Sequence, residues 1–488
     1  MNDVLNGLSE DKIPVIKKIK GPCLVLAGAG TGKTKTIVAK IAYLIENGVK
    51  EDRILCLTFS NNAAASLKEK ISKLLGKETV STVSTFHGFC NEILKEHGNR
   101  LNIPYGFRLI DETDSTMILF KNNLDAKEAS FYANTLMKAK DLDISLKEYK
   151  DFIKKLEASL EIISPEVSKW EEEFKAKNIE LNTLNSLNLE RKEKSARKKE
   201  LSLFVELYSS IMELRDFVKN WEYYETYKDN NGLLDFPDLN LKLLNLMELV
   251  DEDFLRKDYD YVIVDEFQDT SYVQFELLKK VVNANHDITV VGDANQTIYA
   301  FRGAFTDNIK QFRQEFNLTK NDEFRLDNNF RSTQDILDVS YELIKHNYDD
   351  ESEVFKLKSG SENSSKVKIV ECLNGEEEAR SIVDLIDEKS KNIPLSDICV
   401  LYRSHSQGAM IKKFLEKRGY PLQVYGGTDI FANTDISNII SFLEILANFE
   451  KPYFKAGQAW WRLLHNEGFL SGDDSIILAE YIKANKKS

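Results

Sequence analysis

A short apolar run that leads through a glycine-rich loop into a helix constrains this chain more than any other feature. Residues 23–27 (CLVLA) precede the loop, and a helical pattern that stops near Gly48 follows it. Backbone N–H groups in such a loop can wrap a phosphate, and glycine lets the phosphate come close to the chain. The new helix would aim the positive end of its dipole at the same anion. The loop and its flanking residues are Ala27, Gly28, Ala29, Gly30, Thr31, Gly32, Lys33 and Thr34.

An acidic strand end later in the chain complements this loop. Four apolar residues, 261–264, are followed by Asp265 and Glu266. In a nucleotide site Lys33 would reach the β- and γ-phosphates, and the Thr34 hydroxyl would bind Mg²⁺. Asp265 suits the Mg²⁺ shell, and Glu266 suits a general base that orients and deprotonates the attacking water. Two acids after an apolar run are common by chance, so the assignment depends on the residues that follow them.

Short β-branched runs recur towards both ends of the chain and alternate with helical patterns. Because buried runs of this kind are typical of parallel sheets covered on both faces, we predict an α/β fold. The expected strands are residues 23–28, 54–60, 261–266, 288–293, 367–372, 398–403 and 422–427.

The stretch between the expected strands at 54–60 and 261–266 differs in composition from the rest of the chain. Residues 106–227 are rich in Leu, Glu and Lys and almost free of Gly and Pro, which predicts a helical insertion with solvated charged faces. A first core domain would then comprise residues 1–105 and 228–321, and a second would comprise residues 322–447. Residues 448–488 are expected to be helical.

Composition excludes several classes of protein. No window of 18 uncharged apolar residues occurs, and the first residues lack an export signal, so we expect a cytoplasmic protein without a membrane span. None of the five cysteines is spaced as C-x-x-C, which argues against zinc and iron–sulfur sites. Cys23, Cys56 and Cys399 lie in apolar runs and are expected to be buried thiols. A net charge of −13 argues against coating nucleic acid by bulk electrostatics, although it allows a strand to be held by stacking.

Eight segments, taken in chain order, resemble the helicase motifs of the UvrD/Rep/PcrA and RecB/AddA group of superfamily 1. The most specific is VDEFQDT at 264–270, directly on the acidic strand end. This resemblance implies RecA-like P-loop NTPase sheets, the second of them incomplete, and a 448–488 segment that begins an accessory domain. The other segments are 58–71, 85–89, 232–239, 290–304, 326–333, 400–407 and 425–446.

The resemblance also implies roles in ATP hydrolysis. Gln296 would sense the γ-phosphate, and Arg331 would reach it across a domain cleft as an arginine finger. Phe330 lies where the family has an aromatic that stacks on the adenine. The implied cofactors are ATP and Mg²⁺.

DNA contacts follow from the same resemblance. Phe59, Tyr299 and Phe301 match family aromatics that stack on bases. Arg302 and His87 are further candidates for contacts with the DNA strand. The implied activity is a 3′–5′ helicase or translocase on single-stranded DNA or a 3′-tailed duplex, in repair or recombination.

The sequence departs from the family pattern in two places. The family has a Gln fifteen residues before the phosphate loop, whereas this chain has Lys12, which leaves the choice of nucleotide open. Two further family motifs, one of which carries a second catalytic Arg, have no match after residue 447. We therefore expect a truncated form, or one that relies on a partner chain, which binds ATP but unwinds DNA weakly or not at all.

Two alternatives remain open. The chain could be a catalytically silent fragment or subunit that holds nucleotide or single-stranded DNA and needs a partner chain. It could also be a P-loop ATPase of another kind, although the motifs around residues 265–270 and 292–304 argue against this. Stimulation of ATP hydrolysis by single-stranded DNA separates the helicase from the silent fragment.

Overall fold

The computed structural model describes residues 4–122, 124–184, 191–250, 254–297, 307–348, 354, 356–364, 366–424 and 434–447. The chain divides into two compact units, residues 1–365 and 366–488. Among the described residues, no helix has both the length and the apolar character that a membrane span requires.

A six-stranded parallel sheet forms the centre of the first unit, in the order β3-β2-β6-β7-β1-β8. The four strands predicted for this part of the chain are confirmed, each with the same start to within a residue. Two strands were not predicted, β3 and β8, because both are short and polar. The strands are β1 (Pro22–Ala27), β2 (Ile54–Thr58), β3 (Thr82–Thr85), β6 (Tyr261–Val264), β7 (Ile288–Gly292) and β8 (Glu323–Leu326).

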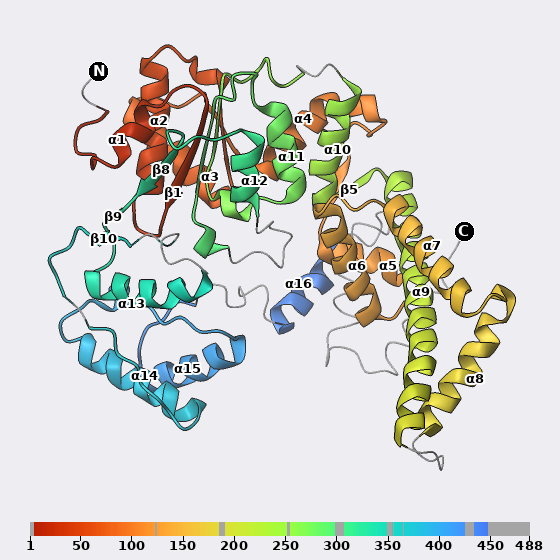
Figure 1. Cartoon of the computed structure of the whole chain (residues 1–488). Helices are drawn as coiled ribbons and strands as arrows, with labels where there is room; N and C mark the ends of the chain where they lie inside the picture. The colour runs from red at the N-terminus through yellow and green to blue at the C-terminus, as the bar shows by residue number, and fades with distance from the viewer. Residues whose placement is uncertain are drawn as a thin grey trace. The chain divides into compact units, whose positions relative to one another are not determined.

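Helices cover both faces of this sheet (Figure 1). Successive residues of β1 alternate between the two cores, since Cys23 and Val25 pack on one face and Leu24 packs on the other. This double burial explains the unbroken apolar runs of the strands. One face carries α1 (Lys12–Lys17), α2 (Lys33–Glu46) and α3 (Asn61–Leu75), and the other carries α4 (Phe86–His97), α10 (Phe236–Leu249), α11 (Tyr272–Val281) and α12 (Asn308–Glu315).

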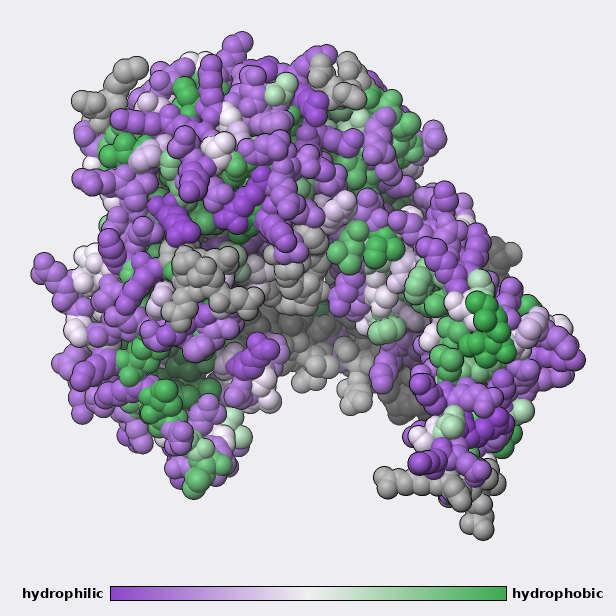
Figure 2. All heavy atoms as spheres, viewed as in Figure 1, coloured by the Kyte–Doolittle hydropathy of each residue, from purple (hydrophilic) through white to green (hydrophobic). Residues whose placement is uncertain are grey.

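The predicted helical insertion is confirmed. Its helices α7, α8 and α9 share a small apolar core, and hydrophilic side chains cover much of the face of the molecule seen in Figure 2. The strands β4 (Arg108–Ile110) and β5 (Leu233–Asp235), neither of them predicted, pair in parallel and hold the two ends of the insertion side by side. The helices are α5 (Glu112–Phe120), α6 (Ala126–Asp141), α7 (Leu146–Ile163), α8 (Trp170–Thr183) and α9 (Arg191–Asn231).

A buried network of charges, the junction cluster (Lys140, Glu225, Lys228, Asp235 and Asp238), joins the insertion to the core. Lys140 Nζ lies 2.7 Å from Asp235 Oδ2 and 2.5 Å from Asp238 Oδ1. Lys228 Nζ lies 2.8 and 2.5 Å from the same two carboxyl groups, and Glu225 is 3.0 Å from each ammonium. Burial alone would raise the pKa of Asp235, but the two lysines hold it well below its usual range. Since the ammonium groups already supply the positive charge that a metal ion would bring, we interpret the cluster as structural.

The segment that follows β8, up to residue 365, belongs to the first unit. Sequence analysis assigns residues 322–447 to the second core domain, but β8 pairs with β1 and residues up to 365 group with the first unit. This segment contains β9 (Asn328–Asn329), α13 (Gln334–Ile344) and β10 (Lys358–Ser359).

The second unit contains helices but lacks the expected strands. Among residues 366–424 no strand forms at 367–372, 398–403 or 422–424, and the remainder of 422–427 lies outside the described residues. Ile369 and Leu401 are each 90% exposed, and Cys399 is exposed, so the prediction of a buried thiol there is wrong, whereas Cys23 and Cys56 are buried. An apolar segment becomes a strand only where neighbouring strands pair with its backbone. The helices are α14 (Gly375–Lys389), α15 (His405–Arg418) and α16 (Thr434–Ala447).

Short 3₁₀ helices connect these elements. They are η1 (Glu51–Arg53), η2 (Gly98–Leu101), η3 (Val167–Lys169), η5 (Phe267–Asp269), η6 (Ala294–Gln296), η8 (Lys345–Asn347) and η10 (Leu395–Asp397).

Candidate nucleotide site

The glycine-rich loop connects β1 to α2 in the expected way. Gly30 and Gly32 have φ of +77° and +86°, a left-handed conformation that favours glycine. The Thr31 hydroxyl donates to the Gly28 carbonyl at 2.8 Å and closes the loop from inside. The helix then begins at Lys33, so its first N–H groups face the space above the loop.

A segment 300 residues further along the chain lies against this loop. The Phe330 N–H donates to the Gly30 carbonyl at 2.9 Å, and Asn329 Nδ2 donates to the Ala29 carbonyl at 2.6 Å. A Cβ atom on Gly30 would lie 2.6 Å from the Cβ of Arg331, so no larger residue fits at position 30. The Arg331 side chain is exposed, and its guanidinium makes no hydrogen bond or ion pair with the described residues. The fold therefore places the base of the Arg331 side chain at the loop.

The acidic strand end faces Lys33. Strand β6 ends at Val264, and Lys33 Nζ lies 2.5 Å from Glu266 Oε2. Glu266 has φ of +51°, which is uncommon for a residue other than glycine and recurs at functional sites. The structure thus brings Lys33 of the loop and Glu266 of the strand end together.

Hydrogen bonds continue from Glu266 to the end of the next strand, β7. Gln268 Nε2 donates to Glu266 Oε2 at 2.9 Å, and Gln268 Oε1 accepts from the Asp293 N–H at 3.0 Å. Gln296 Nε2 in turn donates to Asp293 Oδ2 at 2.7 Å. One chain of contacts therefore runs from Lys33 to Gln296. Sequence analysis missed Gln268 and Asp293, although both lie inside the recognised motifs at 264–270 and 290–304.

A cavity of about 430 Å³ opens beside these groups and is lined by Thr34, Asp265, Glu266 and Gln296 among others. Burial and the charge of Glu266 raise the pKa of Asp265 to about 6, although Lys33 opposes the shift. The same causes raise the pKa of Asp269 to about 6. Burial is the largest cause of both shifts, and a cation bound beside the two carboxyl groups would favour their charged forms.

The polar groups in the cavity fit a hard divalent cation. Thr58 Oγ1 and Asp269 Oδ1 are buried and have no hydrogen-bond partner among the described residues. Carboxylate and hydroxyl oxygens are the ligands that Mg²⁺ prefers, and Thr34 and Asp265 provide one of each. The donor set therefore fits the predicted metal site.

Comparison with protein families agrees with this geometry. The model of the UvrD/REP helicase N-terminal domain matches residues 8–317, and that of the UvrD-like helicase C-terminal domain matches residues 324–468. The chain belongs to the UvrD/REP helicase family. The part for which we expected an incomplete domain is thus matched by the family's C-terminal model.

Curated relatives within this helicase family include two from staphylococci. The ATP-dependent DNA helicase PcrA of Staphylococcus epidermidis and that of Staphylococcus aureus are each 28% identical to this chain over 453 residues. The matched region is 92% of this chain and 55% of each relative, so the chain spans about half the length of these relatives.

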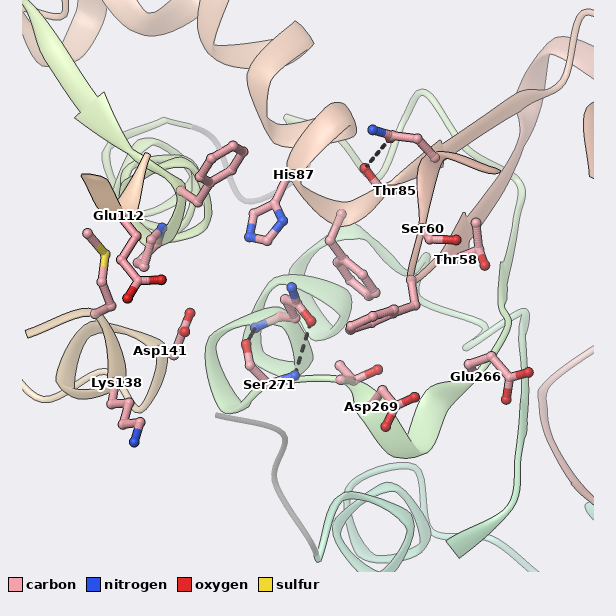
Figure 3. Close-up of a pocket in the computed structure, with 18 of the residues that line it drawn as sticks. Thr58, Ser60, Thr85, His87, Glu112, Lys138, Asp141, Glu266, Asp269 and Ser271 are labelled. Carbon is pink, nitrogen blue, oxygen red and sulfur yellow. Dashed lines mark hydrogen bonds between the residues drawn. The ribbon is translucent and has the colours of Figure 1, made fainter. Parts of the chain in front are cut away.

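A second cavity, of about 740 Å³, extends from the candidate nucleotide site to the helical insertion (Figure 3). Phe59 and His87, both predicted to contact DNA, line it together with Phe236. The His87 ring packs edge-on against Phe236 at 5.6 Å between ring centroids, and burial lowers the pKa of His87. Sequence analysis did not single out Phe236, although it lies in the motif at 232–239.

The opposite wall of this cavity is acidic. Figure 3 shows Glu112, Lys138 and Asp141 on the side of the insertion, across from Glu266. Burial and nearby Asp235 raise the pKa of Asp141 to about 7, although Lys140 opposes the shift. The other predicted DNA contacts, Tyr299, Phe301 and Arg302, lie outside the described residues.

Proposed function

We propose that the chain hydrolyses ATP at the Lys33–Glu266 site and couples hydrolysis to movement along single-stranded DNA. The observation that carries this proposal is the continuous set of contacts from Lys33 through Glu266 and Gln268 to Gln296. It connects the phosphate loop to the end of β7. The positions that match the family's base-stacking aromatics, Tyr299 and Phe301, come next in the sequence. The family membership and the staphylococcal relatives named ATP-dependent DNA helicase support the same conclusion.

Each residue of the site has a defined part in this proposal. Backbone N–H groups of residues 28–34 would hold the phosphates, and Lys33 would leave Glu266 for the β- and γ-phosphate oxygens. The carboxylate of Glu266, once free of Lys33, could orient a water molecule and accept its proton. Mg²⁺ held by Thr34 and Asp265 would supply positive charge beside the phosphates.

The DNA side of the proposal involves the second cavity. Phe59 and His87 would contact bases there, and Tyr299, Phe301 and Arg302 would extend the contact surface. Gln296 would transmit the state of the γ-phosphate to that surface, and Arg331 would complete the charge around it. We propose single-stranded DNA or a 3′-tailed duplex as substrate, 3′–5′ polarity, and a role in repair or recombination.

The predicted domain organisation supports this division of labour. We propose that the first core domain carries the phosphate loop and that a second core domain, which the sequence places at 322–447 although residues up to 365 group with the first unit, contributes to hydrolysis. Residues 106–227 would serve as the helical insertion beside the DNA, and residues 448–488 would begin an accessory domain.

Measurement of ATP hydrolysis with and without single-stranded DNA tests the proposal. We expect hydrolysis to rise severalfold when DNA is added, and Lys33→Ala to lose both the basal and the stimulated rate. Displacement of a 3′-tailed duplex should be weak or absent, and a 5′-tailed duplex should give none. Hydrolysis that ignores DNA would instead indicate a P-loop ATPase of another kind.

A second candidate is a silent subunit that binds nucleotide or DNA and needs a partner chain. The exposed apolar residues of the second unit favour it, because Ile369 and Leu401 are each 90% exposed in segments whose sequence predicts strands. A partner that supplied neighbouring strands would bury them. In this case the chain alone would bind ATP but would not hydrolyse it, whether or not DNA is present.

A further inference from the structure

Lys12 lies buried beneath the candidate nucleotide site. It is the first residue of α1 and is 1% exposed. Its Nζ donates to Ser9 Oγ at 2.6 Å and lies 3.8 Å from Asp11 Oδ1. Its Cε would lie 3.2 Å from a Cβ atom on Gly32, so the side chain runs directly along the phosphate loop.

The ammonium of Lys12 supports the ring of Phe330. Lys12 Nζ lies 4.4 Å from the centroid of that ring, a cation–π contact, whereas Phe330 as a whole is 60% exposed. The Phe330 N–H is bonded to the loop at Gly30, which fixes the ring at the edge of the phosphate site. An aromatic ring that contacts a buried cation and is otherwise largely exposed offers a surface on which a flat base can stack.

The ammonium of Lys12 is held by residues next to it in the chain. Its ammonium is directed inward to Ser9 and Asp11, and Asp11 Oδ2 accepts from the Asp327 and Asn328 N–H groups. Burial lowers the pKa of Lys12, and Asp11 opposes that shift. Stacking does not distinguish hydrogen-bond patterns, because every base has a π-face.

We propose that Phe330, held from behind by Lys12, recognises the base by stacking alone, so that the site accepts any nucleoside triphosphate and ranks them by stacking area. This inference rests on the proposed function, because it assumes that the loop binds the triphosphate. Lys12 acts here as a positioning residue and Phe330 as the contact. Purine nucleotides therefore bind more tightly than pyrimidine nucleotides, and ATP binds no better than GTP.

Competition against a fluorescent nucleotide on the full chain tests this without any substitution. The competitors are the Mg²⁺ complexes of ATP, GTP, CTP and UTP, with inorganic tripolyphosphate as the phosphate-only probe. We expect the dissociation constants of ATP and GTP to agree within about threefold and those of CTP and UTP to be about three- to tenfold weaker, because base stacks are worth roughly 1–3 kcal/mol. A preference for ATP over GTP above tenfold would overturn the inference.

Two variants separate stacking from a polar contact. Phe330→Leu keeps apolar bulk but loses the π-face, and we expect it to weaken ATP and GTP by about tenfold and tripolyphosphate not at all. Lys12→Met keeps the length but loses the charge, and it should weaken all four nucleotides by one common factor, with the same far-UV circular dichroism as the parent. A Lys12→Met variant that changed the ATP-to-GTP ratio would show that Lys12 reads the base.

The tripolyphosphate control distinguishes failure of the proposed function from failure of base stacking on Phe330. Should tripolyphosphate and all nucleotides fail to bind, the proposed function is wrong and this inference falls with it. Should tripolyphosphate bind as tightly as ATP, the phosphate loop stands and stacking on Phe330 is refuted. Since the nucleotide series and Phe330→Leu do not involve the buried Lys12, a Lys12→Met variant that did not fold would leave both results decisive.

Discussion

Two lysine–carboxylate clusters of the first unit differ in how fully their charges are paired. In the junction cluster each ammonium contacts three carboxyl groups, and the side chains of Lys140 and Lys228 are 5% and 1% exposed. At the phosphate loop Lys33 makes one ion pair among the described residues, and its partner Glu266 is 34% exposed at a cavity.

The same residue types therefore serve different purposes. In the junction cluster every charge has a partner, and removing one ammonium would leave three carboxyl groups to share the other, so the cluster fixes the insertion to the core. At the loop Asp265 and Asp269 make no ion pair with any described residue, and burial together with the charge of Glu266 raises the pKa of each to about 6. An incompletely paired cluster at a cavity indicates a ligand, and a completely paired buried one indicates architecture.

The largest effect should follow from removing the charge of Glu266. Glu266→Gln keeps the size of the side chain but cannot accept a proton from water, and we expect DNA-stimulated ATP hydrolysis to fall by roughly 10²–10⁴. Nucleotide affinity should remain within a fewfold of the parent. A steady-state phosphate-release assay measures the rate, and a rate that stayed within threefold would remove Glu266 from the role of general base.

The matched change in the junction cluster should act on stability instead. Lys228→Met leaves Asp235 and Asp238 with one ammonium in place of two, and breaking a buried ion pair in this way costs about 3–5 kcal/mol of unfolding free energy. Lys33→Met, the control, should cost no more than about 1 kcal/mol, because the cavity lets water reach the remaining carboxyl groups. Urea titrations compare the two, and equal losses would erase the distinction between the clusters.

Asp141, between the two clusters, should make stability depend on pH. Its pKa of about 7 in the folded chain lies above the value of 3.8 for an exposed aspartate. The folded chain therefore holds an extra proton between these values, and ionising Asp141 costs free energy as the pH rises through that window. Asp141→Asn stays neutral and should gain on the order of 1–2 kcal/mol at pH 8, with the gain shrinking towards pH 4. A gain of equal size at pH 5 and pH 8 in thermal melts would argue against a raised pKa.

A partly exposed ion pair should have the smallest effect. Lys18 Nζ lies 2.7 Å from Asp322, whose pKa burial would raise but which Lys18 and Thr319 hold at about 2. Lys18→Met should cost less than about 1 kcal/mol, because Asp322 keeps its hydrogen bonds from Thr319. A loss of about 3 kcal/mol in urea titrations would show that a pair whose side chains are 19% and 15% exposed can produce the large effect expected for Lys228.

The sequence predicted the local parts of this site well. The strand, loop and helix around residues 23–48 are contiguous, and four apolar residues deliver Asp265 and Glu266, so each pattern is complete within a short window. The junction cluster could not be predicted in this way, since Lys140 and Asp235 are 95 residues apart and meet only because β4 pairs with β5. The role of Gln268 likewise depends on its contact with Asp293 on the neighbouring strand end.

Errors in the strand prediction have a physical cause as well. Strand β3 (TVST) and strand β8 (EFRL) lack the apolar runs that mark buried strands, yet they pair at the edges of the sheet. Residues 398–403 have such a run but form no strand, because strand formation needs a neighbour that hydrophobicity alone does not reveal.

Titration of Mg²⁺–ATP into the parent chain and into Lys33→Met by calorimetry is the most direct test that the loop cluster is a nucleotide site. The account predicts a roughly ten- to hundredfold loss of affinity in Lys33→Met, since a hydrogen bond to a charged group is worth about 1.5–3 kcal/mol, with the unfolding midpoint nearly unchanged. Equal affinity in the two proteins would contradict it.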